Sequence, residues 1–216
     1  MDSVKVSAHS TSVLTKLSSG IVNFVKKPKL LFWLFIALNL VPNFCLLFTE
    51  PLSGLGKLIL ILVPLSIYMI LFSLFRRAGI MQLILIPVLV LHAFQLVLFY
   101  LFGESVIAVD MFLNLPTTNA SEAGELLGNI WPSIIIVCVL YIPVIVLASI
   151  AVHHKVKRTA VFRKQMITWG IIFFIVDSGL VAFEKHRDNS YEVKTDIYPA
   201  NVMYNLYYAC VKWNRS

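Results

Sequence analysis

The chain has 216 residues, of which 59% are hydrophobic and only 13% are charged. Because about a quarter of the residues in a soluble domain are charged, this composition excludes an ordinary soluble protein and indicates an all-α, polytopic membrane protein. The net charge of +7 indicates topology and contact with anionic membrane lipids rather than nucleic-acid binding, because no basic stretch is interleaved with aromatic residues in a soluble module.

Five apolar stretches are long enough to cross a bilayer as helices: residues 30–48, 58–75, 80–102, 132–152 and 165–183. They divide the chain into a cytoplasmic leader at 1–29, a five-helix transmembrane domain at 30–183, and a periplasmic juxtamembrane tail at 184–216. The first stretch is too long for the h-region of a cleaved signal peptide, so the first helix is expected to stay in the membrane.

A few polar residues interrupt the spans. Asn39, Pro42 and Asn43 lie in the first span, and because lipid cannot satisfy their polar groups, they are expected to face protein or a cavity as packing or kink residues. His92 has no acidic partner at helical spacing, so a packing role is expected for it. Asp177 in the fifth span can pair with His92 or meet a lipid head group, but a snorkelling or hydrogen-bonded acid is the simpler reading.

The basic residues predict the orientation. Of the 18 Lys and Arg residues, 12 lie in the leader, between the second and third spans, and between the fourth and fifth. The two short segments on the other side hold only Lys57. Because cytoplasmic loops carry an excess of Lys and Arg, the sequence predicts a cytoplasmic N-terminus, a C-terminus on the outer side, and an outer position for the segment between the third and fourth spans.

That segment, Gly103 to Asn129, is the longest polar interruption between spans, and a short outer-face helix is predicted within it. Asn114, Thr118 and Glu122 are spaced at i, i+4 and i+8, so on a helix they share one face. A carboxylate beside amide and hydroxyl oxygens can bind an ammonium head group.

The same residues also fit the start of a helix. Pro116 is a good first-turn residue, and Asn119 followed three positions later by Glu122 is a capping box. The residues alone leave the ligand face and the helix cap as alternatives.

The tail is rich in aromatic and basic residues. Aromatic residues of this kind predict an interfacial belt: Tyr198, Tyr204, Tyr207, Tyr208 and Trp213. With Lys194, Lys212 and Arg215, they predict a segment that lies along the bilayer surface and docks a following domain.

Two motifs resemble those of a known family. Asn114 to Ala123 fits Asn-x-x-x-Thr-Asn-x-Ser-Glu-Ala, which resembles the motif in the membrane domain of the lipid A phosphoethanolamine transferases. This sulfatase-like family of the bacterial inner membrane includes the enzymes of colistin (polymyxin) resistance. Tyr198-Pro-Ala-Asn-x-x-Tyr204 resembles the Pro-x-Asn segment with which that family leaves the membrane. The resemblance covers essentially the whole chain, but only the front portion of such an enzyme.

The resemblance implies a site and a reaction. Asn114, Thr118 and Glu122 would bind phosphatidylethanolamine, the donor lipid, near a catalytic zinc. The implied role is stronger for Thr118 and Glu122 than for Asn114. Pro116 lies within the motif, and a helix that begins there leaves Asn114 outside the shared face. A zinc-activated threonine of a periplasmic domain would then pass phosphoethanolamine to a lipid A phosphate.

The zinc ligands and the nucleophile are expected to lie outside these residues. After Glu184 the only histidine is His186, and three scattered cysteines make no zinc site of the Cys-x-x-Cys kind. The catalytic domain is therefore expected to be missing, and the 216-residue chain alone is expected not to transfer phosphoethanolamine. The alternative hypothesis is a non-enzymatic five-span scaffold or assembly factor whose outer helix binds a partner protein.

Overall fold

The computed structural model describes residues 19–103 and 120–213, and for residues 120–129 it describes the helix without its side chains. Over these ranges the chain is helical and has no strand, so the predicted all-α class is confirmed. A helix at residues 19–25 precedes the first apolar stretch.

Two helices form the first apolar stretch, α2 at Pro28–Asn39 and α3 at Val41–Thr49. Both have proline in the first turn, where its missing N–H costs nothing. The next helix, α4 at Gly54–Leu74, is capped by Ser53, whose hydroxyl accepts a hydrogen bond from the Gly56 N–H at 2.9 Å. The break between α2 and α3 agrees with the kink expected near Pro42.

The third predicted span, residues 80–102, is divided in two. It consists of α5 at Ile80–Ile84 and α6 at Ile86–Phe102. Leu85 separates them, one residue before Ile86 and two before Pro87. Proline has no N–H to donate to the preceding turn and its ring crowds that turn, which accounts for the division.

The helix α8 at Ala120–His153 is continuous over 34 residues, with Pro132 and Pro143 inside it. The sequence predicts a span at 132–152 with a separate outer-face helix before it. From Ala120 to His153 the chain is one helix, so a separate helix is not confirmed, and residues 104–119 lie outside the described part.

The last long helix, α9 at Ala160–Arg187, begins five residues before and ends four residues after the predicted fifth span, 165–183. Thr159 caps it by accepting a hydrogen bond from the Phe162 N–H at 3.3 Å. Two shorter helices follow, α10 at Val193–Asp196 and α11 at Ala200–Trp213.

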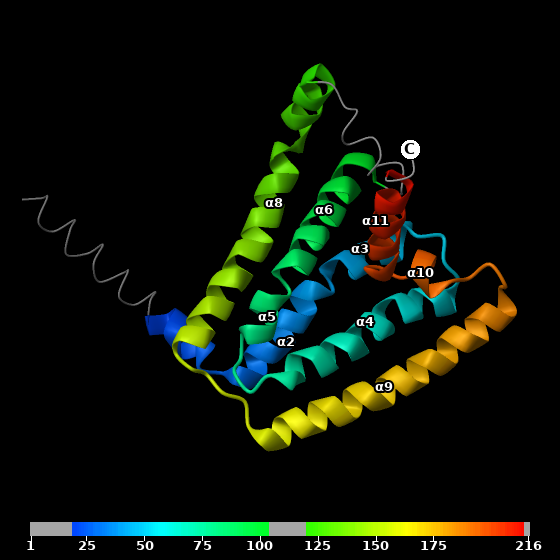
Figure 1. Ribbon diagram of the computed structural model, residues 1–216. Helices are drawn as coiled ribbons and strands as arrows, with labels where there is room; N and C mark the ends of the chain where they lie inside the picture. The colour runs from blue at the N-terminus through cyan, green and yellow to red at the C-terminus, as the bar shows by residue number, and fades with distance from the viewer. Residues whose placement is uncertain (1–18, 104–119, 214–216) are drawn as a thin grey trace, which may run out of the picture.

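Figure 1 shows α9 running alongside α4 and α8 running alongside α5 and α6, with α10 and α11 between the two pairs. Gly170 allows α9 to approach α4 closely, because a Cβ at this position would meet the Ile70 Cγ1 atom at 2.8 Å. The C-terminal segment packs against both pairs, since Tyr198 and Val202 lie in one cluster with Leu60 of α4 and Leu91 of α6.

The turns at residues 75–79 and 154–159 lie together at what we call the basic end of the molecule. The Ala78 N–H donates to the Val156 carbonyl at 2.8 Å, and the Arg158 N–H donates to the Arg76 carbonyl at 2.9 Å. Gly79 has a φ of 95°, and a Cβ there would overlap the Ala148 carbonyl group. Only glycine fits this close approach without strain.

Two arginines of the following segment satisfy the carbonyl groups at the end of α4. The Arg163 Nε and Nη2 atoms donate to the carbonyls of Ser73 and Leu74 at 2.8 and 2.6 Å, and Arg158 Nη2 donates to the Phe75 carbonyl at 3.2 Å. The last carbonyls of a helix have no partner within it, and cations are favourable beside them. Burial, with the nearby charge of Arg163, lowers the pKa of Arg158 to about 10.

An aromatic core lies next to the basic end. Phe32 packs edge-on against Phe72 and Phe162, with ring centroids 6.5 and 5.2 Å away, and Phe35 stacks on Phe72 at 6.1 Å. The Arg158 guanidinium lies 5.4 Å from the centre of the Phe32 ring. These contacts join α2, α4 and α9 where their ends meet.

Four helical segments are long and apolar enough to cross a membrane: Pro28–Thr49, Gly54–Leu74, Ile130–His153 and Ala160–Arg187. Only 11% of the most apolar part of the last segment is buried in the protein, and an apolar surface of this extent suits lipid. The third predicted span contributes a shorter apolar helix, Ile86–Leu101. The count of five spans therefore stays a prediction.

Candidate functional site at the junction of the helices and the tail

The predicted head-group residues fall at the edge of the described chain. Asn114 and Thr118 lie outside it, and Glu122 falls in the first turn of α8, where only the helix is described. Acidic residues stabilise the first turn of a helix, so this position agrees with both the capping and the ligand hypotheses. The row of three residues stays a prediction.

The C-terminal tail, by contrast, is built into the helical domain. Tyr198 and Val202 are fully buried and pack against Leu46 of α3 and Leu60 of α4. The sequence predicts Tyr198 as part of an interfacial aromatic belt, and this is wrong for that residue. The cluster that contains Tyr198 is completed by partly buried apolar side chains of the spans, including Leu91 of α6.

Asn43 holds the tail in this position. Its Nδ2 atom donates to the Tyr198 carbonyl at 2.8 Å and to the Leu60 carbonyl at 3.0 Å, and its side chain has no exposed surface. One amide thus joins α3, α4 and the tail. The expectation that polar residues of the first span face protein is confirmed for Asn43 and for Asn39, whose Nδ2 donates to Gln82 Oε1 at 2.9 Å.

A second connection fixes the end of α9. The Ser53 hydroxyl donates to the Glu184 carboxylate, which also accepts from Arg187 Nη2 at 2.6 Å. Next to it, Tyr191 packs against Ile59 of α4. Burial raises the pKa of Tyr191 to about 12, and the neighbouring carboxylates of Asp196 and Glu184 act in the same direction.

The segment that follows α10 also buries aromatic surface around His92. The His92 ring lies 5.5 Å from the Tyr198 ring and 6.2 Å from the Tyr141 ring. His92 Nε2 is 3.3 Å from the Tyr68 hydroxyl, and the ring is fully buried. The packing role expected for His92 is confirmed. Asp177 of α9 is also buried, and its side chain faces Ser66 of α4.

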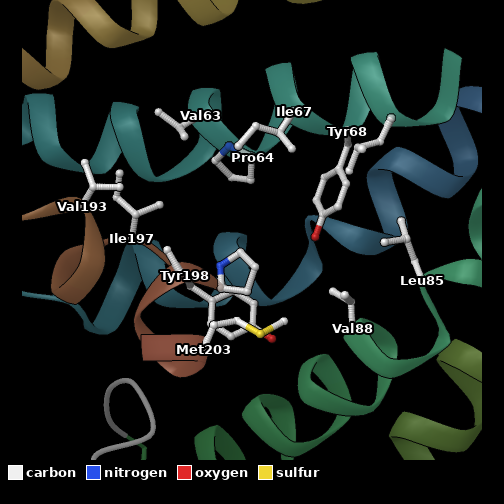
Figure 2. Close-up of a pocket in the computed structure, with 13 residues that line it drawn as sticks. Val63, Pro64, Ile67, Tyr68, Leu85, Val88, Val193, Ile197, Tyr198 and Met203 are labelled. Atoms are coloured by element: carbon white, nitrogen blue, oxygen red, sulfur yellow. The ribbon is translucent and has the colours of Figure 1, made fainter. Parts of the chain in front are cut away.

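A cavity of about 250 Å³ lies beside this cluster. Figure 2 shows it between α4, the junction of α5 with α6, and the tail. Its walls are almost entirely carbon and come from both the spans and the tail: Val63, Pro64, Ile67, Tyr68, Leu71, Leu85, Val88, Val193, Ile197, Tyr198, Pro199, Ala200 and Met203.

The rest of the tail keeps the exposed aromatic surface that the sequence predicts. Tyr207, Tyr208 and Trp213 of α11 are exposed. Tyr204 stacks on Tyr208 at 6.4 Å, and the Lys194 ammonium lies 5.2 Å from the centre of the Tyr204 ring. Their exposure agrees with an aromatic belt on α11, and the position of that belt at the bilayer surface stays a prediction.

The described part of the chain offers no group of three or more His, Cys, Asp or Glu side chains placed to hold a metal ion. The described residues therefore do not fit a zinc site. What the arrangement can do is hold a tail at a fixed position on a set of apolar helices, beside a cavity that accepts hydrocarbon.

Sequence reasoning missed the burial of the tail. The signal was present, since Asn43 interrupts an apolar run and Tyr198-Pro199-Ala200-Asn201 is a short motif in a polar tail. Neither feature indicates which residue it contacts, because Asn43 and Tyr198 are 155 positions apart in the sequence. Only the fold brings the two together.

The chain was compared with curated proteins, solved structures and family models. No curated protein and no solved structure gave a significant match. A family model described as phosphoethanolamine transferase EptA/EptB, and covering the N-terminal part of those proteins, matches residues 59–212. The match includes Glu122, the cavity and the buried tail, and it extends over more than half of the chain. The chain therefore belongs to the N-terminal domain family of the phosphoethanolamine transferases EptA/EptB.

Proposed function

We propose that this chain is the membrane domain of an enzyme that moves phosphoethanolamine from phosphatidylethanolamine to lipid A. The observation that carries the proposal is the family match over residues 59–212, which contains the motif from Asn114 to Ala123. The buried tail supports it, because a tail fixed to the spans can hold a following domain at a constant place above the bilayer.

In this proposal the donor head group binds at the start of α8. The Glu122 carboxylate pairs with the ammonium group, and the oxygens of Thr118 and Asn114 accept its remaining N–H donors. A lipid held in this way presents its phosphate on the same side as the tail. The zinc of the catalytic domain, when bound, would activate the threonine nucleophile.

The protein is proposed to lie in the bacterial inner membrane with its basic end in the cytoplasm. Ten Lys and Arg residues gather at that end, and they come from the turns before α2, α5 and α9 and from the first residues of α2 and α9: Lys26, Lys27, Lys29, Arg76, Arg77, Lys155, Lys157, Arg158, Arg163 and Lys164. The positive-inside tendency then puts Glu122 and the tail on the periplasmic side.

The test is head-group selectivity in a purified system. The full 216-residue chain, extracted from membranes of mixed composition, is examined by native mass spectrometry for retained phosphatidylethanolamine and phosphatidylglycerol. We expect a preference for phosphatidylethanolamine that Glu122→Gln abolishes. Glu125→Gln, which removes the same charge three residues along, is the matched control and should keep the preference.

Two outcomes would overturn the proposal. One is equal retention of both lipids by the unaltered chain, which would favour the scaffold hypothesis. The other is an unchanged preference in Glu122→Gln. Since head-group selectivity is the quantity compared, general adhesion of lipid to the apolar surface does not affect the result.

A further inference from the structure

The cavity beside the tail borders two turns of α4. Its wall on α4 runs from Val63 to Leu71, a distance of roughly 12 Å at the rise of an α-helix. Two groups of residues face this wall, namely Leu85 and Val88 at the junction of α5 with α6, and the segment from Ile197 to Met203 in the tail (Figure 2).

The cavity walls offer nothing to a charged or strongly polar ligand. No Asp, Glu, Lys, Arg or His side chain lines them. The Tyr68 hydroxyl already has His92 Nε2 as a partner at 3.3 Å. A buried water needs two to four polar partners, and these walls do not supply them. The occupant that fits is a hydrocarbon.

The cavity is open where its lining residues are exposed. These are Ile67, Val193 and Met203, which are 37%, 38% and 45% exposed. Ile67 lies well inside the apolar span Gly54–Leu74, so at least this part of the mouth faces the hydrocarbon of the bilayer. Met203 adds an adaptable side chain at the rim.

We infer that one acyl chain of a bilayer phospholipid occupies this cavity and packs between α4 and the tail. The chain would fill space that would otherwise leave its lining without van der Waals partners. It would also place a lipid molecule in direct contact with Pro199 and Ala200, next to the carbonyl that Asn43 holds. The acyl site does not depend on the proposed transfer reaction, because it needs only a membrane around the helices.

The test uses phospholipids that carry a photoactivatable diazirine within one acyl chain. The full chain is reconstituted into nanodiscs with these lipids, irradiated and digested, and the labelled peptides are mapped by mass spectrometry. We expect labelling at the cavity that excess unlabelled phospholipid saturates and displaces. The lipid-exposed surface around Ile175 of α9, which is 65% exposed, should give lower labelling without saturation.

Filling variants decide whether the cavity is the site. Ala200→Phe fills the cavity from the tail, and Val88→Phe fills it from α6. Each should reduce cavity labelling to the level seen around Ile175, whereas the control Ile175→Phe should leave it unchanged. Because the two fillers lie on different elements, and each is first checked for monodisperse elution, a folding defect in one does not decide the outcome.

Labelling by lipids with different head groups shows which phospholipid supplies the acyl chain. Equal labelling by phosphatidylethanolamine and phosphatidylglycerol supports an acyl site open to any bilayer lipid. A preference for phosphatidylethanolamine also supports the acyl site and identifies the lipid with the proposed donor. Labelling that is uniform over the apolar surface, or that both fillers leave unchanged, would overturn the inference even if head-group selectivity at Glu122 were established.

Discussion

Asn43 shows how much a single buried amide can determine. Its two donated hydrogen bonds satisfy a carbonyl of α4 and the carbonyl of Tyr198, and both acceptors lie away from water. A buried acceptor that loses its partner costs about 1–3 kcal/mol. Asn43 therefore adds a directional connection to the apolar contacts that Tyr198 and Val202 make with the spans.

Asn43→Ala is expected to loosen the tail. Hydrogen exchange measured by mass spectrometry should become faster in residues 197–203, because the Tyr198 carbonyl loses its donor while the helical domain stays folded. Asn39→Ala is the matched control. It removes a similar buried amide that bonds Gln82 instead of the tail, so exchange in 197–203 should not respond to it. Equal acceleration in both variants would contradict the role of Asn43.

Tyr191 gives the tail a dependence on alkaline pH. Its pKa in the folded chain is about 12, above the usual value of about 10, so folding favours the protonated phenol. Its stabilising contribution is complete below pH ~10 and is lost as the pH rises from about 10 to 12. Protease sensitivity of the tail in detergent should rise over this window, and less so in Tyr191→Phe. A flat profile in the unaltered chain would refute this.

At the level of the helices, the basic end joins α4, α5, α8 and α9 through two short turns. Arg158 and Arg163 satisfy the last carbonyls of α4, and the Ala78–Val156 and Arg158–Arg76 backbone bonds fasten the two turns. The tail end is fastened differently, by Ser53 with Glu184 and by Asn43 with Tyr198. α4 is thus held at both of its ends, and the cavity opens along its middle.

Arg163→Ala is expected to weaken the connection of α9 to α4. The variant removes two charge-assisted donors from the Ser73 and Leu74 carbonyls, at a cost of about 1–2 kcal/mol at a partly exposed helix end. The apparent Tm in detergent should fall. Lys164→Ala removes an exposed cation from the next position and should leave it unchanged. A similar fall in both variants would mean that net charge, rather than capping, is responsible.

At the scale of the molecule, sequence reasoning predicts the parts of the fold that follow from local composition. Apolar runs give the all-α class, and buried Asn39 and Asn43 follow from the cost of an unsatisfied amide in lipid. Pro132 suggests a helix boundary that does not occur, because a long helix in a membrane setting tolerates proline. The insertion of Tyr198 could not be predicted, because an aromatic residue in a polar tail fits a membrane interface as well as a protein core. The local sequence is the same in both cases.

The orientation of the whole molecule can be measured with its own cysteines. In a Cys45→Ser, Cys138→Ser background, exposed Cys210 on α11 should react with a membrane-impermeant maleimide in intact spheroplasts. His154→Cys at the basic end, in a background without other cysteines, should react only after lysis. The reverse pattern would contradict the proposed cytoplasmic position of the basic end.

Phosphoethanolamine transfer supported by this domain tests the proposed function most directly. Residues 1–216 are joined to the catalytic domain of a characterised phosphoethanolamine transferase, and lipid A from expressing cells is analysed by mass spectrometry. We predict modified lipid A with the unaltered domain and with Glu125→Gln, and its loss with Glu122→Gln. Modification no greater than that obtained with an unrelated membrane anchor carrying the same catalytic domain would contradict the account.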